Sequence, residues 1–165
     1  MTLFVKDRSE TSSDGRGDFD FFAGKWRVAH RRLRRRLVGD THWEEFSGEC
    51  ECRQIIGGLG NVDDNALDLP SGRYRAATLR LFDPQANRWS ISWIDSRAMR
   101  IEPPVHGGFA NGIGTFEGGD VLDGRPIRVR FIWSGITSDA ARWDQSFSPD
   151  GGKTWEHNWT MTFTR

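Results

Sequence analysis

The sequence predicts an all-β fold: an antiparallel β-barrel of about eight to ten strands behind one short N-terminal helical turn. Three observations lead to this prediction. Apolar and polar side chains alternate along several segments, so each segment can bury one face. Turn-forming residues separate these segments at short intervals, without a helical pattern longer than one turn. The composition agrees, because 8 Trp and 11 Phe accompany 19 Gly and only 1 Tyr in 165 residues.

The expected strands fill most of the chain after residue 24. The first two, residues 24–37 and 42–55, form a hairpin around a loop that contains Gly39 and Asp40. Further strands are expected at residues 73–82, 88–95, 112–121, 126–134, 141–148 and 153–165. The segments 57–72 and 96–108 are expected as loops at the rim of the barrel.

The chain is predicted to form a single domain, residues 18–165, after a flexible arm at residues 1–17. The arm is polar and shows no periodicity. Residues 18–23 can form the helical turn, with Asp18 as its cap and the phenylalanines as an apolar plug.

The first hairpin contains a basic run at residues 31–36. Pairing across the expected turn places Arg35 opposite Glu44 and Arg34 opposite Glu45, which makes the run a solvated, charge-paired strand. An RNA-binding strip is the alternative interpretation. Because Lys plus Arg and Asp plus Glu each number 23, no net charge attracts nucleic acid or a membrane surface. We therefore expect neither nucleic acid nor a membrane as a partner. We expect the protein to be a monomer or a homodimer.

The sequence also bears on compartment and metal content. It contains no run of about 18 apolar residues and begins without a basic leader, so we expect a cytoplasmic protein. Cys50 and Cys52 leave the same face of one strand, where a mutual disulfide would strain the backbone, so we expect free thiols. A zinc site needs further ligands at suitable spacing, which are missing, and we expect no metal.

Residues 148–155 fit the pattern S-x-D-x-G-x-T-W, which resembles the Asp-box hairpins of sialidases and other propellers. Propellers repeat such hairpins, whereas this chain has one copy. We interpret it as a structural turn in which Asp150 accepts backbone hydrogen bonds and Trp155 packs beneath the loop. The glycine-rich segments 57–60 and 107–114 lack phosphate-loop spacing, and no hydrolase nucleophile motif occurs.

The alternation indicates which side chains face the interior of the barrel. Tryptophans recur in the inward phase of several strands, which favours a lumen that binds a small apolar or aromatic molecule. The candidate ligand-binding residues are Trp43, Glu45, Tyr74, Trp93, Trp133, Gln145, His157 and Trp159. A barrel completely filled by these aromatics is the alternative.

The segment Gly24-Lys25-Trp26 resembles the G-x-W signature of lipocalins and the wider calycin superfamily. In that family an arginine near the end of the last strand packs across the tryptophan, and Arg165 occupies the corresponding place. The chain as a whole is similar to an uncharacterised bacterial family of lipocalin-like domains of unknown function. The resemblance implies a barrel whose base is closed by Trp26 and Arg165 through a cation–π contact.

Two other functions remain open at this stage. One is a cofactor-free barrel enzyme of the cyclase or isomerase type, with His157 or Glu45 as acid or base. The other is haem binding through His157, the one cofactor considered. Both require these side chains to face the lumen.

Overall fold

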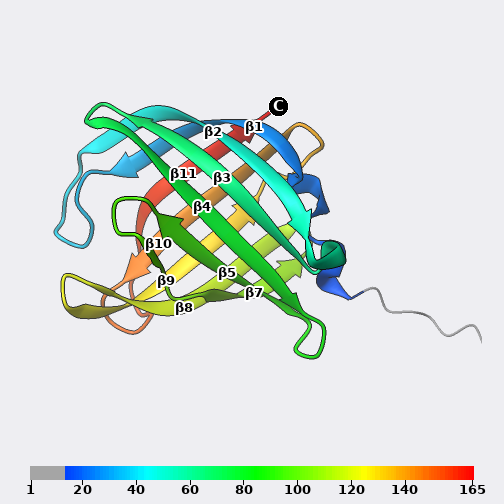
Figure 1. Ribbon diagram of the computed structural model, residues 1–165. Coiled ribbons are helices and arrows are strands. Elements are labelled where there is room, and N and C mark those ends of the chain that lie inside the picture. The colour runs from blue at the N-terminus through cyan, green and yellow to red at the C-terminus, as the bar shows by residue number, and fades with distance from the viewer. Residues whose placement is uncertain (1–13) are drawn as a thin grey trace, which may run out of the picture.

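Ten long strands close into an antiparallel β-barrel in the computed structural model, which describes residues 14–165 (Figure 1). The strands are β1 (Gly24–Leu33), β2 (Trp43–Ile55), β3 (Gly60–Leu69), β4 (Gly72–Asp83), β5 (Arg88–Asp95), β7 (Val105–Ala110), β8 (Ile113–Leu122), β9 (Arg125–Ser134), β10 (Ala140–Ser148) and β11 (Glu156–Thr164), with a two-residue strand β6 (Arg100–Ile101) beside β5. Neighbours follow the order β4-β3-β2-β1-β11-β10-β9-β8-β7-β5, and pairing of β4 with β5 closes the ring. The predicted fold class is confirmed.

The N-terminal segment closes one end of the barrel, on the right in Figure 1. It contains two 3-10 turns, η1 (Gly15–Gly17) and η2 (Asp20–Phe22). Phe19 and Phe22 are buried against aromatic rings of the lumen, such as that of Trp133, which lies 5.7 Å from Phe19 and 4.9 Å from Phe22 between centroids. The predicted plug of phenylalanines is therefore present.

The boundary of this segment differs from the predicted arm. Residues 1–13 of that arm lie outside the described residues, whereas residues 14–17 are part of the barrel. The Trp89 indole N–H donates a hydrogen bond to the Gly15 carbonyl over 2.8 Å, and the Gly15 N–H donates to Asn87. The predicted cap by Asp18 is wrong, because η2 begins after Phe19 without a side-chain hydrogen bond. Asp14 caps the preceding turn, η1, by accepting from the backbone N–H of Arg16.

Two segments that were expected as rim loops are strands. β3 lies within the expected loop 57–72, and β7 overlaps the expected loop 96–108. The first inward positions of β3 are Asn61, Asp63 and Asn65, all buried, and buried Leu67 follows in the same phase. Because three consecutive inward positions are polar, most of the strand shows no apolar alternation, which is the usual sequence signal of a half-buried strand.

The first hairpin has a longer loop and a different register than expected. Glu45 pairs with Arg31, and not with Arg34. Backbone pairing in the hairpin stops at the bond from the Arg34 N–H to the His42 carbonyl. Asp40 holds the loop by accepting from the backbone N–H groups of Arg35 and His42. This capping stabilises a nine-residue loop, 34–42, in place of the expected tight turn.

A β-bulge interrupts the pairing of β10 with β11. Gln145 pairs with Trp159 and Ser146 pairs with His157, so Asn158 is the extra residue. Because the extra residue shifts the alternation by one position, residues before the bulge point to the opposite side of the sheet from the side that the later residues predict. Trp159 and the residues after it keep their expected phase, whereas His157 is turned to the outside.

The hairpin between β10 and β11 has the structural role that its Asp-box sequence indicates. The Asp150 carboxylate accepts from the N–H groups of Lys153 and Thr154 and from the Thr154 hydroxyl. These hydrogen bonds lower the pKa of Asp150 to about 2. Trp155 donates to the Gly152 carbonyl and stacks 3.9 Å from the guanidinium of Arg130.

Candidate functional site

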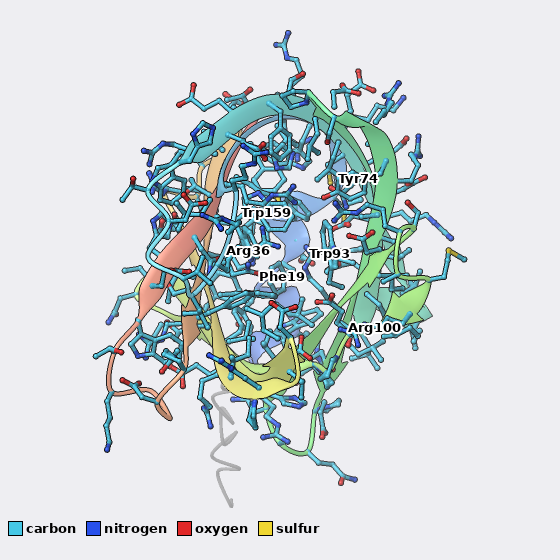
Figure 2. All side chains as sticks on the ribbon, turned by 90° about the vertical axis from the view of Figure 1, so that its left-hand side faces the viewer. Phe19, Arg36, Tyr74, Trp93, Arg100 and Trp159 are labelled. Carbon is cyan, nitrogen blue, oxygen red and sulfur yellow. The ribbon has the colours of Figure 1, made fainter. Side chains whose placement is uncertain are left out.

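The end of the barrel opposite the N-terminal segment is called the mouth here. Because consecutive strands are antiparallel, every second connection lies at this end. These connections are residues 34–42, 70–71, 96–104, 123–124 and 149–155. Figure 2 looks into the mouth from the left-hand side of Figure 1 and shows Arg36, Tyr74, Trp93 and Trp159 around the interior, with Phe19 between them.

Arg32 is the most unusual side chain near the mouth. It lies on the inward face of β1 and is only 6% exposed. One of its guanidinium nitrogens, Nη1, donates to the Tyr74 hydroxyl over 3.1 Å, and the group lies 5.3 Å and 5.0 Å from the ring centroids of Phe46 and Trp159. Its Nε has no hydrogen-bond partner, and no acidic side chain among residues 14–165 forms an ion pair with it. Burial of an unpaired charge costs several kcal/mol, which aromatic faces and one hydroxyl repay only in part.

Two more arginines, Arg36 and Arg97, lie near the mouth, together with the acidic side chains of Glu102 and Glu156. Arg36 is half-buried and donates to the Leu33 carbonyl over 3.2 Å. Burial lowers its pKa, and the charges of Arg32 and Arg97 add to this effect. Arg97 lies 3.7 Å from the Tyr74 ring centroid but is paired with Asp95 over 2.6 Å. Two arginines therefore point their positive charge at the mouth without a carboxylate partner in the described part of the chain.

His30 is the histidine that faces the lumen. It lies two residues before Arg32 on β1, farther from the mouth. Its ring stacks on Phe46 with 4.6 Å between centroids, and its Nδ1 accepts from the Trp159 indole N–H over 3.2 Å. Burial, followed by the charge of Arg32, lowers the pKa of His30 to about 3. The imidazole is therefore neutral at pH 7, with its proton on Nε2 because Nδ1 is the acceptor. It holds the rings of Phe46 and Trp159 in place beside Arg32.

The buried imidazole predicts a loss of stability in mild acid. An unfolded histidine titrates near 6.5, so below this pH the unfolded chain binds a proton that folded His30 does not. The unfolding free energy should thus fall as the pH falls from 6.5 toward 3, by about 1.4 kcal/mol per pH unit. Urea denaturation at pH 7 and pH 4.5 measures this, with His30→Gln as the comparison. We expect the wild type to lose about 2–3 kcal/mol more than the variant; equal losses would contradict the assignment.

A second polar group lies deeper in the lumen, between β3 and β4. Asp63 is 2% exposed and Arg80 is 3% exposed, and Arg80 Nη1 lies 2.7 Å from Asp63 Oδ2. The other carboxylate oxygen of Asp63 accepts from the Thr78 N–H and the Asn65 side chain. Arg80 Nη1 also donates to Asn61 over 2.9 Å. Both oxygens of the Asp63 carboxylate thus accept hydrogen bonds from protein groups.

Two small cavities of about 20 Å³ each lie inside the barrel. The deeper one is lined by Asp63, Asn65, Thr78, Arg80, Ile91, Trp93, Phe131, Trp133, Trp143, Met161 and Phe163. The other lies beside Glu102, Asp120 and Gln145. Each has room for about one water molecule. Ile91, Trp93 and Phe131 border both cavities, so a larger ligand requires movement of these side chains. Trp93 and Phe131 are half-buried, whereas Ile91 is buried.

Five of the eight predicted binding residues lie inside the barrel. Tyr74 and Trp159 surround Arg32 near the mouth, Trp93 and Gln145 line cavities, and Trp133 is buried against the N-terminal plug. Gln145 also donates to the side chain of Asn158 over 3.0 Å. These positions follow the alternation of their strands, while a role in ligand binding stays a prediction.

The expected inward placement of the other three is wrong. Trp43 and Glu45 lie on the outer surface, where Arg31 is 4.1 Å from the Trp43 ring centroid and 3.8 Å from the Glu45 carboxylate. His157 is turned outward by the bulge, with Nε2 2.9 Å from Asp144 and its ring 5.6 Å from that of Trp43. The enzyme and haem hypotheses that depend on His157 or Glu45 therefore have no geometric basis in the lumen.

The base of the barrel contains the contact that the family resemblance implies. The Arg165 guanidinium lies 4.0 Å from the Trp26 ring centroid. It also donates to the carbonyls of Phe21 and Ala23, over 3.0 Å and 2.8 Å. Arg165 thus attaches the end of the last strand to the N-terminal segment.

The two cysteines are free and buried on the inward face of β2. Burial raises the pKa of both thiols, that of Cys52 to about 11 and that of Cys50 further. Both are therefore protonated and unreactive at pH 7. Within residues 14–165 no group of three His, Cys, Asp or Glu side chains is placed to hold a metal ion. No helix in the same range has the length and apolarity to cross a membrane.

The sequence interpretation missed the polar residues of the lumen. Arg32 was counted with a solvated basic run, although it shares the inward phase of Trp26, Val28 and His30. Arg80 likewise shares the phase of Ala76 and Phe82. An arginine that continues an apolar phase is a signal that could have identified both. Asp63 carried no such signal, because β3 itself was not recognised.

The fold is a calycin-like, lipocalin-like β-barrel closed at one end. No known family profile and no curated protein sequence matches the chain. Among solved structures, it is similar to the S-type phycobiliprotein lyase of Guillardia theta, with a TM-score of 0.59, 11% sequence identity and 93% of each chain covered. At this identity the similarity shows a shared fold.

Proposed function

We propose that the protein binds a small, flat, mostly apolar molecule in the barrel lumen, and that Arg32 holds an anionic group of this molecule. The observation that carries the proposal is the burial of Arg32 without an acidic partner in residues 14–165. A ligand carboxylate or sulfonate would complete the ion pair that residues 14–165 leave open. Neither a cofactor nor a metal is part of this proposal.

The surroundings of Arg32 support the same ligand class. Phe46 and Trp159 offer ring faces on which an aromatic ligand can stack, and the Tyr74 hydroxyl provides a second polar contact. Half-buried Arg36 adds positive charge at the entrance. A charge that is unfavourable in the free protein is typical of a site shaped by its ligand. The phycobiliprotein lyase has the same barrel fold, which is consistent with small-molecule binding by a barrel of this kind. It does not identify a ligand for this chain.

Two matched fluorescent probes test the proposal. 1-Anilinonaphthalene-8-sulfonate is flat, aromatic and anionic, while N-phenyl-1-naphthylamine is the same molecule without the sulfonate. We expect saturable one-to-one binding of the anionic probe, with a Kd at least about tenfold lower than that of the neutral probe, because a charge-assisted hydrogen bond to a buried arginine contributes about 1.5–3 kcal/mol. Fluorescence titration at pH 7 measures both.

The competing results are distinct. Equal affinity for the two probes would indicate an apolar lumen without an anion site. No saturable binding of either probe would support the completely filled barrel.

A further inference from the structure

Two residues that line the deeper cavity each contain a buried hydrogen-bond donor without a partner within residues 14–165. These donors are Arg80 Nε and the Trp133 indole N–H, and both are buried without an acceptor in the described structure. Both residues line the same cavity of about 20 Å³, and the Arg80 guanidinium carbon lies 5.6 Å from the Trp133 ring centroid. A buried donor without a partner is unfavourable by about 1–3 kcal/mol. A cavity with two such residues in its wall is a candidate place for an acceptor oxygen.

The charges near the deep cavity indicate whether the acceptor oxygen is charged or neutral. Arg80 already forms an ion pair with Asp63, and Nη1 provides that contact. A second carboxylate at Nε would leave one net negative charge in a lumen walled by Phe19, Phe22 and Trp133. A neutral acceptor, such as a carbonyl or hydroxyl oxygen, satisfies the donors without this penalty. The deep position therefore differs from Arg32, where the positive charge has no partner.

The distance between the two positions sets the length of the ligand. Tyr74, which contacts Arg32, and Arg80 lie six residues apart on β4, both inward. Six residues of strand span about 20 Å, or about 15 Å along the axis of a barrel with tilted strands. Trp93, Met161 and Trp143 line the deep cavity together with the polar side chains of Asn65 and Thr78.

We propose that the deep cavity is a subsite for a neutral acceptor oxygen, bound by Arg80 Nε and Trp133 Nε1, so that the ligand is an elongated acid with a carbonyl or hydroxyl group at its far end. This inference rests on the proposed function, because Arg32 holds the acidic end. The ligand lies along the barrel axis, with its anion at the mouth and its neutral oxygen at the base. Binding requires Trp93 to move away from Trp159, which lies beside Arg32, so that the space near Arg32 joins the deep cavity.

Three biphenyl acids of similar length test the subsite by isothermal titration calorimetry. They are 4′-acetylbiphenyl-4-carboxylate, 4′-isopropylbiphenyl-4-carboxylate and biphenyl-4,4′-dicarboxylate, which place a neutral oxygen, a methyl group of the same shape and a second anion at the far end. We expect the acetyl compound to bind about tenfold more tightly than the isopropyl compound, and the dicarboxylate to bind most weakly.

The variant Trp133→Phe removes one donor while keeping an aromatic ring and the Asp63–Arg80 pair. It should reduce the preference for acetyl over isopropyl several-fold, whereas Trp143→Phe, which removes the same atoms from the same cavity, should preserve it. Equal binding of the acetyl and isopropyl acids, with affinity still lost in Arg32→Met, would overturn the subsite but keep the proposed function. Tightest binding of the dicarboxylate would overturn the neutral-oxygen assignment. No binding of any of the three acids would count against both proposals.

Discussion

Replacing Asp63 with asparagine is expected to lower the unfolding free energy by about 3–5 kcal/mol. The substitution keeps the shape of the side chain and an oxygen that can accept from the Thr78 N–H. It removes the negative charge that lies 2.7 Å from Arg80 Nη1, in a place where both side chains are almost fully buried. The guanidinium then stays charged among aromatic rings without a counter-ion, which is among the least favourable situations inside a protein.

The neighbouring residue supplies a matched control. Asp64 points outward on the same strand and forms an ion pair with Arg75 over 2.6 Å, but both side chains are more than half exposed. Asp64→Asn should therefore change the stability by less than about 1 kcal/mol. The double variant Asp63→Asn, Arg80→Met should recover most of the loss, since it removes the unpaired charge as well. Urea denaturation at pH 7 compares the three; losses of similar size in Asp63→Asn and Asp64→Asn would refute this description of the lumen.

Replacing Arg32 with methionine is expected to have opposite effects on binding and on stability. Affinity for 1-anilinonaphthalene-8-sulfonate should fall about tenfold to a hundredfold, because the sulfonate loses its charged donor. Affinity for N-phenyl-1-naphthylamine should stay within about twofold, since methionine maintains an apolar wall. The unfolding free energy should not decrease, because methionine fills the volume without burying an unpaired charge beside Phe46 and Trp159.

Arg53→Met is the control for this experiment. Arg53 is exposed on β2, outside the barrel, so its loss removes the same charge from the molecule without changing the lumen. It should leave both probe affinities unchanged. A loss of affinity for the anionic probe that is equal in the two variants would show a general effect of net charge, and would remove Arg32 from the site.

The barrel could be predicted from the sequence because most of its strands obey one simple rule. In β5, β9 and β11 the inward positions are large and apolar, so the period of two is visible in the residues themselves. The end of the barrel could be predicted too, since Trp26 and Arg165 occupy the places that the family resemblance indicates.

The candidate site could be predicted only in part, because its polar residues break the rule that identifies strands. Asn61, Asp63 and Asn65 occupy the first three inward positions of β3. Arg80 from another strand donates to Asn61 and Asp63, and Asn65 donates to Asp63. Such pairing is a tertiary property that no local pattern contains. A single extra residue at Asn158 similarly decides that His157 faces outward, and a bulge of this kind leaves no clear mark in a sequence.

A crystal structure of the complex with 4′-acetylbiphenyl-4-carboxylate tests the central claim most directly. We expect the molecule inside the barrel, with its carboxylate within hydrogen-bond distance of the Arg32 guanidinium and Tyr74 hydroxyl, and with the side chain of Trp93 displaced from its position against Trp159. A molecule bound on the outer surface, or one inside the barrel whose carboxylate avoids Arg32, would contradict the account.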